Sequence, residues 1–180
     1  MNSDLVLLTR AADYAARQHL AQRRKGERAE PYINHLTEVA TLLAEATDGN
    51  DVVLVMGGLL HDTLEDTDAT YEDLVQRFGP EVAALVAEVT DDKSLKKEER
   101  KRLQVEKAGS KSQRARMLKI ADKTSNLRSL IESPPKGWTG ERLRDYVVWA
   151  EQVVRSCRGL NARLEAVFDA AHETASKRFG

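Results

Sequence analysis

Several features are scarce in this sequence, and each scarcity excludes a class of protein. There is only one cysteine, Cys157, so no internal disulfide can form and a disulfide-stapled scaffold is excluded. No apolar run reaches the roughly 18 residues that a membrane-spanning helix requires, and the longest, at 52–60, contains two glycines. The N-terminal residues lack a basic region before their short apolar run, which argues against a secretory signal peptide. We therefore expect a cytoplasmic protein with no membrane partner and with Cys157 in its core.

Disorder is also excluded, because 41% of the 180 residues are hydrophobic and the 28 Lys and Arg nearly balance the 29 Asp and Glu. Prolines number only four, and no low-complexity tract or fixed repeat occurs. A chain of this length is long enough to bury one substantial core. The sequence therefore predicts a single domain spanning residues 1–180.

Charge is distributed unevenly along the chain. Residues 93–119 contain eleven Lys and Arg against three Glu, a local balance of +8, whereas the rest of the chain sums to −9 because the total is −1. One interpretation is a solvated helix face with Glu98 and Arg102 spaced for an i,i+4 ion pair. A nucleic-acid partner is disfavoured, because the segment has no aromatic residue on which bases could stack. A phosphate-rich small molecule is the other interpretation.

Apolar residues recur at intervals of three and four nearly throughout the chain, and no convincing strand pattern occurs. We therefore predict an all-α fold. Thr70 and Asp73 have the spacing of a capping box, and Asp51 is placed to cap the apolar helix that follows it. That helix is apolar on all sides, so we expect it to be central and buried. The expected helices cover residues 5–19, 35–46, 52–60, 71–78, 81–89, 96–107 and 112–130, followed by one long helix or a broken pair over 146–171.

A histidine and an aspartate, His61 and Asp62, end the buried helix. A charge in such surroundings is costly unless it is paired or coordinated. With His35 and Asp122, each at or in an expected helix, they form a set of two imidazoles and two carboxylates that suits manganese, iron or zinc. Taken singly, each of these residues is equally at home in a core or a helix cap, which is the interpretation we give to the two other histidines, His19 and His172.

An acidic segment follows this pair directly. Glu65 lies about one helical turn beyond Asp62 and could face the same cavity, where a carboxylate can deprotonate a water. The alternative for this segment is an acidic surface turn before the Thr70 cap. Spacing alone does not separate the two.

Four segments resemble the successive signatures of the RelA/SpoT-type HD-superfamily hydrolases. They are PYINH (31–35), LLHDTLEDTDAT (59–70), FGPEVAALVAEVTDD (78–92) and KIADKTSNLRSL (119–130). Two further segments, ERKRLQVEKA (99–108) and KGWTGERLRDYVVWAEQVV (136–154), are similar to those of stand-alone small alarmone hydrolases of the metazoan SpoT homologue type. The resemblance covers nearly the whole chain in one register.

The resemblance implies a compact, all-helical HD domain that binds one manganese ion, with zinc or iron as alternatives. It also implies hydrolysis of the 3′-pyrophosphate of guanosine tetra- and pentaphosphate to GDP or GTP and pyrophosphate, without synthetase activity. The implied metal ligands are His35, His61, Asp62 and Asp122, and the implied catalytic pair is Glu65 and Asp66. Implied substrate contacts are Arg24, Lys25, Lys97, Asn126, Arg142 and Tyr146, with Arg100 and Lys101 as further cations facing phosphates.

The sequence departs from the family pattern in three places. Leu36 replaces a proline, Thr124 and Ser125 replace bulkier residues, and the loop at 26–30 is longer than in the bifunctional enzymes. Two alternatives to the guanosine alarmone are kept. One is the same chemistry on an adenosine alarmone or on the ribose phosphate of NADPH, and the other is a non-catalytic nucleotide sensor. A sensor should have lost Glu65, Asp66 or a ligand, and none is lost. The expected partner is a small nucleotide rather than a nucleic acid, and the oligomeric state does not follow from the sequence.

Overall fold

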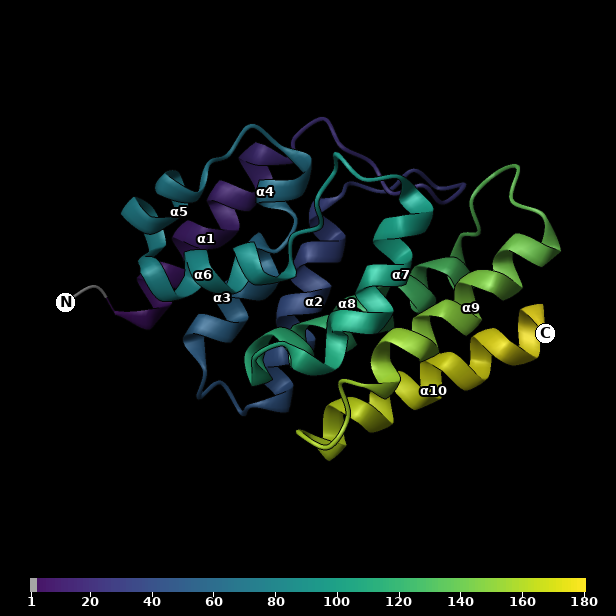
Figure 1. The fold of residues 1–180 in the computed structure, drawn as a ribbon. Helices are drawn as coiled ribbons and strands as arrows, with labels where there is room; N and C mark the ends of the chain where they lie inside the picture. Colours follow the sequence, from purple (N-terminus) through teal and green to yellow (C-terminus); the bar gives the residue numbers. More distant parts are fainter. Residues whose placement is uncertain (1–2) are drawn as a thin grey trace.

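A computed structural model describes residues 3–180, and this part of the chain is helical without strands, as the sequence predicts (Figure 1). Two isolated β-bridges, Arg23 to Pro31 and Gly26 to Pro135, are the exceptions to helix and loop. No helix within residues 3–180 combines the length and apolarity needed to cross a membrane. The helices are α1 (Asp4–Gln18), α2 (Ile33–Ala46), α3 (Val52–Leu60), α4 (Thr63–Asp66), α5 (Tyr71–Phe78), α6 (Pro80–Val89), α7 (Lys97–Lys107), η1 (Ala108–Ser110), α8 (Gln113–Glu132), α9 (Gly140–Arg155) and α10 (Ala162–Phe179).

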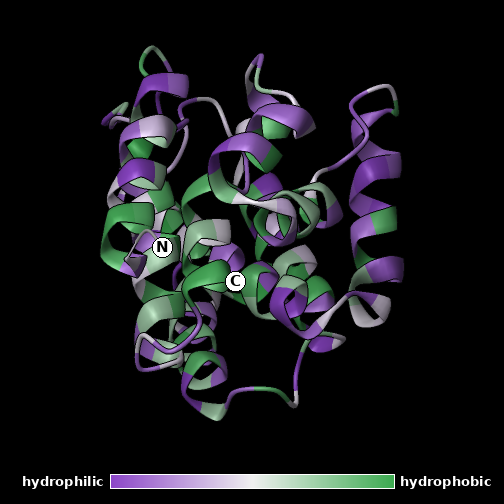
Figure 2. Cartoon of the chain, turned by 90° about the vertical axis from the view of Figure 1, so that its left-hand side faces the viewer, coloured by the Kyte–Doolittle hydropathy of each residue, from purple (hydrophilic) through white to green (hydrophobic). Residues whose placement is uncertain are grey.

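The apolar helix α3 is central, as expected, and packs against α1, α2, α6 and α8. The core has two parts. One lies among α1, α2, α3, α5 and α6, and the other joins α2, α3 and α6 to α8, α9 and α10. Figure 1 shows α1 and α5 at one end of the molecule and α9 and α10 at the other. In Figure 2 green apolar turns face inward and purple hydrophilic turns predominate outside, which is the amphipathic pattern read from the sequence.

Local signals in the sequence set most helix ends. The Asp51 side chain accepts a hydrogen bond from the Leu54 amide at 3.1 Å, and Thr70 and Asp73 form the predicted reciprocal capping box.

The C-terminal stretch is a broken pair, α9 and α10, not one helix. The predicted Glu98–Arg102 pair is wrong, since Arg102 pairs instead with Glu99 and Glu106.

A glycine permits the close packing of α2 against α3. A Cβ atom on Gly58 would lie 3.0 Å from the Cα atom of Ala40, which is tighter than real Cβ contacts normally allow. The absence of a side chain therefore lets the two backbones approach. This approach sets the separation of His35, in the first turn of α2, from His61, directly after α3.

Candidate active site

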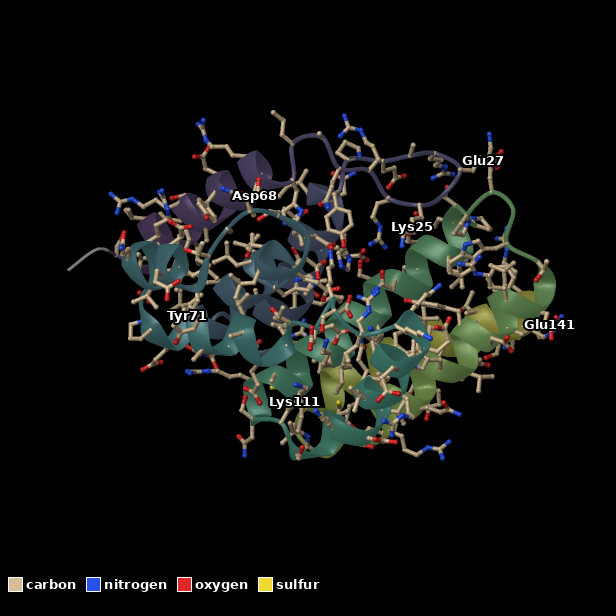
Figure 3. All side chains as sticks on the ribbon, turned by 45° about the horizontal axis from the view of Figure 1, so that its top comes forward. Lys25, Glu27, Asp68, Tyr71, Lys111 and Glu141 are labelled. Carbon is tan, nitrogen blue, oxygen red and sulfur yellow. The ribbon has the colours of Figure 1, made fainter. Side chains whose placement is uncertain are left out.

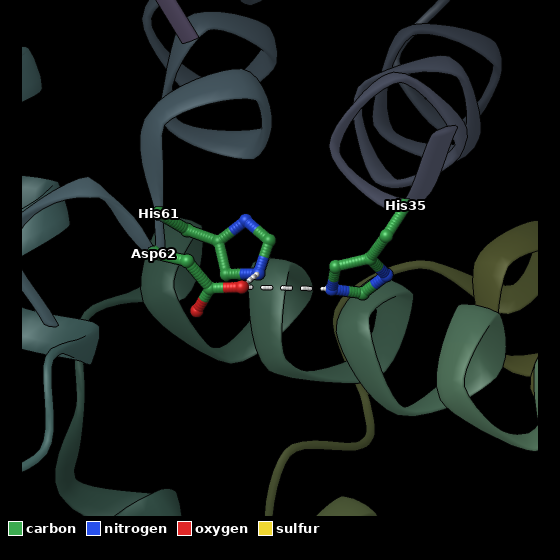
Figure 4. A group of neighbouring side chains, drawn as sticks. All are labelled: His35, His61 and Asp62. Atoms are coloured by element: carbon green, nitrogen blue, oxygen red, sulfur yellow. Dashed lines mark ion pairs between the residues drawn. The ribbon is translucent and has the colours of Figure 1, made fainter. Parts of the chain in front are cut away.

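Two histidines and two aspartates converge where α2, α3 and α8 meet. Nε2 of His61 lies 3.1 Å from Oδ2 of Asp62 and 3.9 Å from Oδ1 of Asp122. Nε2 of His35 lies 3.7 Å and 3.4 Å from the same two oxygens. Figure 4 shows the two rings and the Asp62 carboxylate turned toward a common point. The structure thus brings together the four residues named as metal ligands from the sequence.

The donor set fits a divalent cation. Both histidines are buried, and each uses Nδ1 on the side away from the carboxylates: His35 toward Ser125 Oγ at 2.8 Å, His61 toward the Gly58 carbonyl at 2.9 Å. Nε2 of His61 is buried without a hydrogen-bond partner. A buried nitrogen is rarely left unpaired, and a two-nitrogen, two-oxygen set suits first-row metals. A cation at this point would satisfy that nitrogen.

Burial and neighbouring charges act on the titration of the four groups. Burial lowers the pKa of His35. Burial also disfavours the charged form of His61, but the adjacent Asp62 carboxylate outweighs it and raises the pKa of that imidazole. For both carboxyls burial acts to raise the pKa, yet His61 beside Asp62 and Lys123 beside Asp122 hold each pKa below its usual value. The site therefore holds two carboxylates in their ionised form.

Glu65 and Asp66 lie on the short helix α4, directly after Asp62. Glu65 accepts a hydrogen bond from the Asp91 amide at 3.2 Å and pairs with Arg100 at 3.3 Å. Burial raises the pKa of its carboxyl. Asp66 forms an ion pair with Lys93. Glu65 is thus a half-buried carboxylate facing the cavity, as the functional interpretation of its spacing expects, rather than a surface acid.

A single cavity of about 720 Å³ is lined by every residue for which the sequence suggested a site role. These are Arg24, Lys25, His35, His61, Asp62, Glu65, Asp66, Lys97, Asp122, Asn126, Arg142 and Tyr146, together with Arg100 and Lys101. Asn126 links two of the groups, because it accepts from Arg24 at 3.2 Å and donates to Asp122 at 2.6 Å. Residues from the loop between α1 and α2, from α2 and from α4, α7, α8 and α9 therefore line one cavity.

The basic segment 93–119 divides between the cavity and the outer surface. Lys97 and Lys119 line the cavity, whereas Lys111 donates to the Glu88 carbonyl and lies far from the cavity-lining Lys25 in Figure 3. Glu27, on the same loop as Lys25, points outward and pairs with Lys136 at 3.6 Å. Some cations of the segment thus face the cavity, where a phosphate-rich molecule could meet them, and others lie outside it.

Three aromatic side chains of the cavity have no role in the site predicted from the sequence. Trp138 and Trp149 carry cations over their rings, with Arg142 4.3 Å from one ring centroid and Lys123 4.5 Å from the other. The chain has only two tryptophans, and both line this cavity, which is a signal that composition offered. Tyr32 also lines the cavity and belongs to the PYINH segment. Leu36 is fully buried in the core.

Comparison with known proteins agrees with this geometry. The HD domain family matches residues 11–150. Guanosine-3′,5′-bis(diphosphate) 3′-pyrophosphohydrolase MESH1 of Drosophila melanogaster is 52% identical over 156 residues, 87% of each chain, and that of Homo sapiens is 48% identical over 165 residues, 92% of each chain. A solved structure described as a metazoan ortholog of SpoT that hydrolyzes ppGpp superposes with a TM-score of 0.90 at 47% identity, covering 99% of this chain and 97% of the other. A Listeria monocytogenes structure superposes at 0.66 with 33% identity, covering 83% and 96%.

Proposed function

The chain belongs to the HD domain family, and we propose that it hydrolyses guanosine 3′,5′-bis(diphosphate) and its pentaphosphate to GDP or GTP and pyrophosphate. The observation that carries the proposal is that two buried histidines, two aspartates, a half-buried glutamate and several cations line one cavity. A substrate with two pyrophosphates needs such a combination of acid–base groups and positive charge. The proposed activity is hydrolysis alone, without synthesis of the nucleotide.

The four ligand residues would hold a divalent cation, which supplies Lewis acidity toward water and toward the phosphoryl oxygens. Glu65 accepts a proton from the attacking water, whose oxygen forms the new bond to the 3′ phosphorus. The bond between that phosphorus and the ribose 3′ oxygen breaks, and this oxygen takes up a proton from solvent to become the 3′ hydroxyl of GDP or GTP, while the phosphorus leaves in pyrophosphate. Asp66, which pairs with Lys93 and lines the same cavity as Glu65, orients the water.

The remaining cavity residues bind the nucleotide. Lys97 and Arg142 offer donors to phosphate oxygens distant from the reacting bond, and Arg100 and Lys101 are further cations that face phosphate groups. Arg24 and Asn126 are hydrogen-bonded to each other beside Asp122, and Lys25 lines the same cavity. Tyr146, between Trp138 and Trp149 at centroid distances of 5.8 and 5.4 Å, provides an aromatic surface for a purine.

The proposal also covers the metal ion, the cellular compartment and the domain organisation of the protein. The ion is manganese, since the mixed nitrogen and oxygen set accommodates it, with zinc or iron as the competing metals. The protein acts in the cytoplasm on a small nucleotide and not on a nucleic acid, which is consistent with a lone, buried cysteine and a cavity of about 720 Å³. Residues 1–180 act as one domain.

The test is product analysis after incubation of the purified protein with Mn²⁺ and guanosine 3′,5′-bis(diphosphate). We expect equimolar GDP and pyrophosphate. Release of orthophosphate instead, or no product while metal is bound, would contradict the proposal. The adenosine alarmone and NADPH, assayed alongside, distinguish the guanosine substrate from the two other substrates that share this chemistry.

A further inference from the structure

A row of hydrogen bonds runs outward from His35, on the side of the ring that faces away from the cavity. Nδ1 of His35 lies 2.8 Å from the hydroxyl oxygen of Ser125, and that hydroxyl donates to Oε2 of Glu38 at 2.6 Å. The other carboxylate oxygen of Glu38 accepts from Arg128 at 3.0 Å. His35 and Ser125 are buried, whereas the Glu38 and Arg128 side chains are 34% and 40% exposed. The row therefore connects the candidate metal centre to the surface.

The row arises from the register of two packed helices. His35 and Glu38 are three residues apart on α2, and Ser125 and Arg128 are three residues apart on α8. Residues at this spacing share one face of a helix, so each helix presents a pair to the other. Asp122, three residues before Ser125, lies on the same face of α8 and contributes to the metal centre. One face of α8 thus supplies both a candidate ligand and the support for another.

The directions of these hydrogen bonds determine which nitrogen of His35 carries a proton. A serine hydroxyl has one proton, and that of Ser125 is donated to Glu38. The Ser125 oxygen can then only accept, so Nδ1 of His35 is the protonated nitrogen in the neutral ring. Nε2 of His35 is left with a free lone pair directed at Asp62 and Asp122. A neutral imidazole ligates a metal through such a lone pair.

We infer that Ser125 and Glu38 are positioning residues that fix the tautomer and orientation of His35 for metal binding. The inference rests on the proposed metal-dependent function. His61 reaches the same state by another route, since its Nδ1 faces the Gly58 carbonyl, which can only accept. One histidine is therefore set by backbone and the other by a side-chain relay, and only the relay can be removed by substitution.

The test measures Mn²⁺ affinity of the metal-free full-length protein by electron paramagnetic resonance of free Mn²⁺, together with the histidine tautomers by ¹⁵N NMR. Glu38→Ala frees the Ser125 hydroxyl to turn and donate to Nδ1, so a population of His35 with its proton on Nε2 should appear while His61 is unchanged. We expect the Kd for Mn²⁺ to rise about 10- to 100-fold, the range typical of groups that orient a ligand. Glu38→Gln retains an accepting oxygen and should recover most of the affinity.

Ser125→Ala removes the acceptor for Nδ1 and should raise the Kd for Mn²⁺ by a similar factor. Thr124→Val is its matched control, because Thr124 is an equally buried neighbour whose hydroxyl donates only within α8, to the Ile120 carbonyl. It should leave both the Kd and the His35 tautomer unchanged. If Ser125→Ala does not fold, the comparison of Glu38→Ala with Glu38→Gln decides by itself.

Equal Kd values for Mn²⁺ in Glu38→Ala and Glu38→Gln, or an unchanged His35 tautomer in Glu38→Ala, would overturn the inference. A parent protein that binds Mn²⁺ and shows the expected variant effects but releases no pyrophosphate would leave the inference standing and refute the proposed function. Pyrophosphate release by the parent with no effect of Glu38→Ala on Kd would do the reverse. The two failures are therefore distinguishable.

Discussion

The Tyr32 hydroxyl donates a hydrogen bond of 2.7 Å to Oδ2 of Asp62, the same oxygen that lies 3.1 Å from Nε2 of His61. The Tyr32 ring is stacked on His19 at a centroid distance of 5.2 Å. Burial, followed by the Asp62 charge, raises the pKa of Tyr32 far above its ordinary value, so the hydroxyl remains a donor. A rigid phenol thereby fixes the direction of one candidate metal ligand.

Replacing this tyrosine should weaken metal binding without removing it. Tyr32→Phe leaves the ring in its stack but frees the Asp62 carboxylate, so we expect the Kd for Mn²⁺ to rise about tenfold. Titration of the metal-free protein measures this change. Tyr71→Phe, at an exposed position, is the control and should have no effect. An unaltered Kd in Tyr32→Phe would show that the hydrogen bond does not organise the site.

Loss of a ligand should remove the metal and its stabilising effect. In the parent, Mn²⁺ at about 100 times its Kd adds about 2.7 kcal/mol to the free energy of unfolding, which corresponds to a rise in Tm of about 5–10 °C. His61→Ala should abolish this rise and retain no metal by elemental analysis. His172→Ala, which changes a histidine stacked on Phe168, should keep the rise. A variant lacking His61 that still holds one ion would remove this residue from the ligand set.

Glu65→Gln separates proton transfer from binding. The amide keeps the size of the side chain but cannot accept the proton of water, so kcat should fall about 10²- to 10⁴-fold while metal content and substrate affinity stay nearly constant. Steady-state kinetics and a substrate-binding titration measure the two effects. Glu72→Gln, on the exposed first turn of α5, should behave as the parent. Parental turnover in Glu65→Gln would return Glu65 to the role of a structural acid.

The pH dependence of kcat/KM should follow the charges around Glu65. A base works only when ionised, so activity falls as pH drops through the raised pKa of Glu65. Burial is the main cause of the raised pKa and the charge of the Asp91 carboxylate adds to it, so Asp91→Asn should move the acid limb to lower pH. Arg100, 3.3 Å from Glu65, favours the ionised form, and Arg100→Met should move the limb to higher pH. Profiles are measured at saturating Mn²⁺, and shifts of one sign in both variants would contradict the assignment.

Lys97 and Arg142, which line the cavity, should contribute to substrate binding more than to turnover. Lys97→Ala and Arg142→Ala should each raise KM about five- to tenfold at low ionic strength, with a smaller effect in high salt because both side chains are exposed. Lys107→Ala, on the exposed end of the same helix as Lys97, is the matched control. KM values within about twofold of the parent would assign the phosphates to Arg24 and Lys25 instead.

Much of the fold could be predicted because the features that set helix ends and helix burial depend on neighbouring residues in the sequence. The caps at Asp51 and Thr70 and the apolar character of α3 depend on residues within one or two helical turns. The candidate metal ligands His61 and Asp62 were recognisable because they follow directly on α3, a helix that has no polar side chain. The remaining site residues came from the resemblance to a family, and the structure supplies the distances among them.

Other features did not follow from the spacing of residues along the sequence. The helix α4 has only four residues and was not predicted. Arg102 pairs with Glu99 and Glu106 and not with Glu98, and spacing alone cannot decide among these three partners. Ser125 was noted only as a departure from a family pattern, yet it supports His35 from a position 90 residues away. Such roles appear only when α2 and α8 are seen side by side.

The candidate metal centre lies at the junction of the two parts of the core. His35 and His61 are adjacent to Leu36 and Leu60, which belong to the cluster with α1 and α5, whereas Asp122 follows Ile120 and Ala121 of the cluster with α9 and α10. An ion bound by residues of both clusters would hold the two clusters together, because neither cluster can separate from the other without breaking a metal–ligand bond. Metal-free protein should then exchange its amide hydrogens in two independent units, and the loaded protein in one.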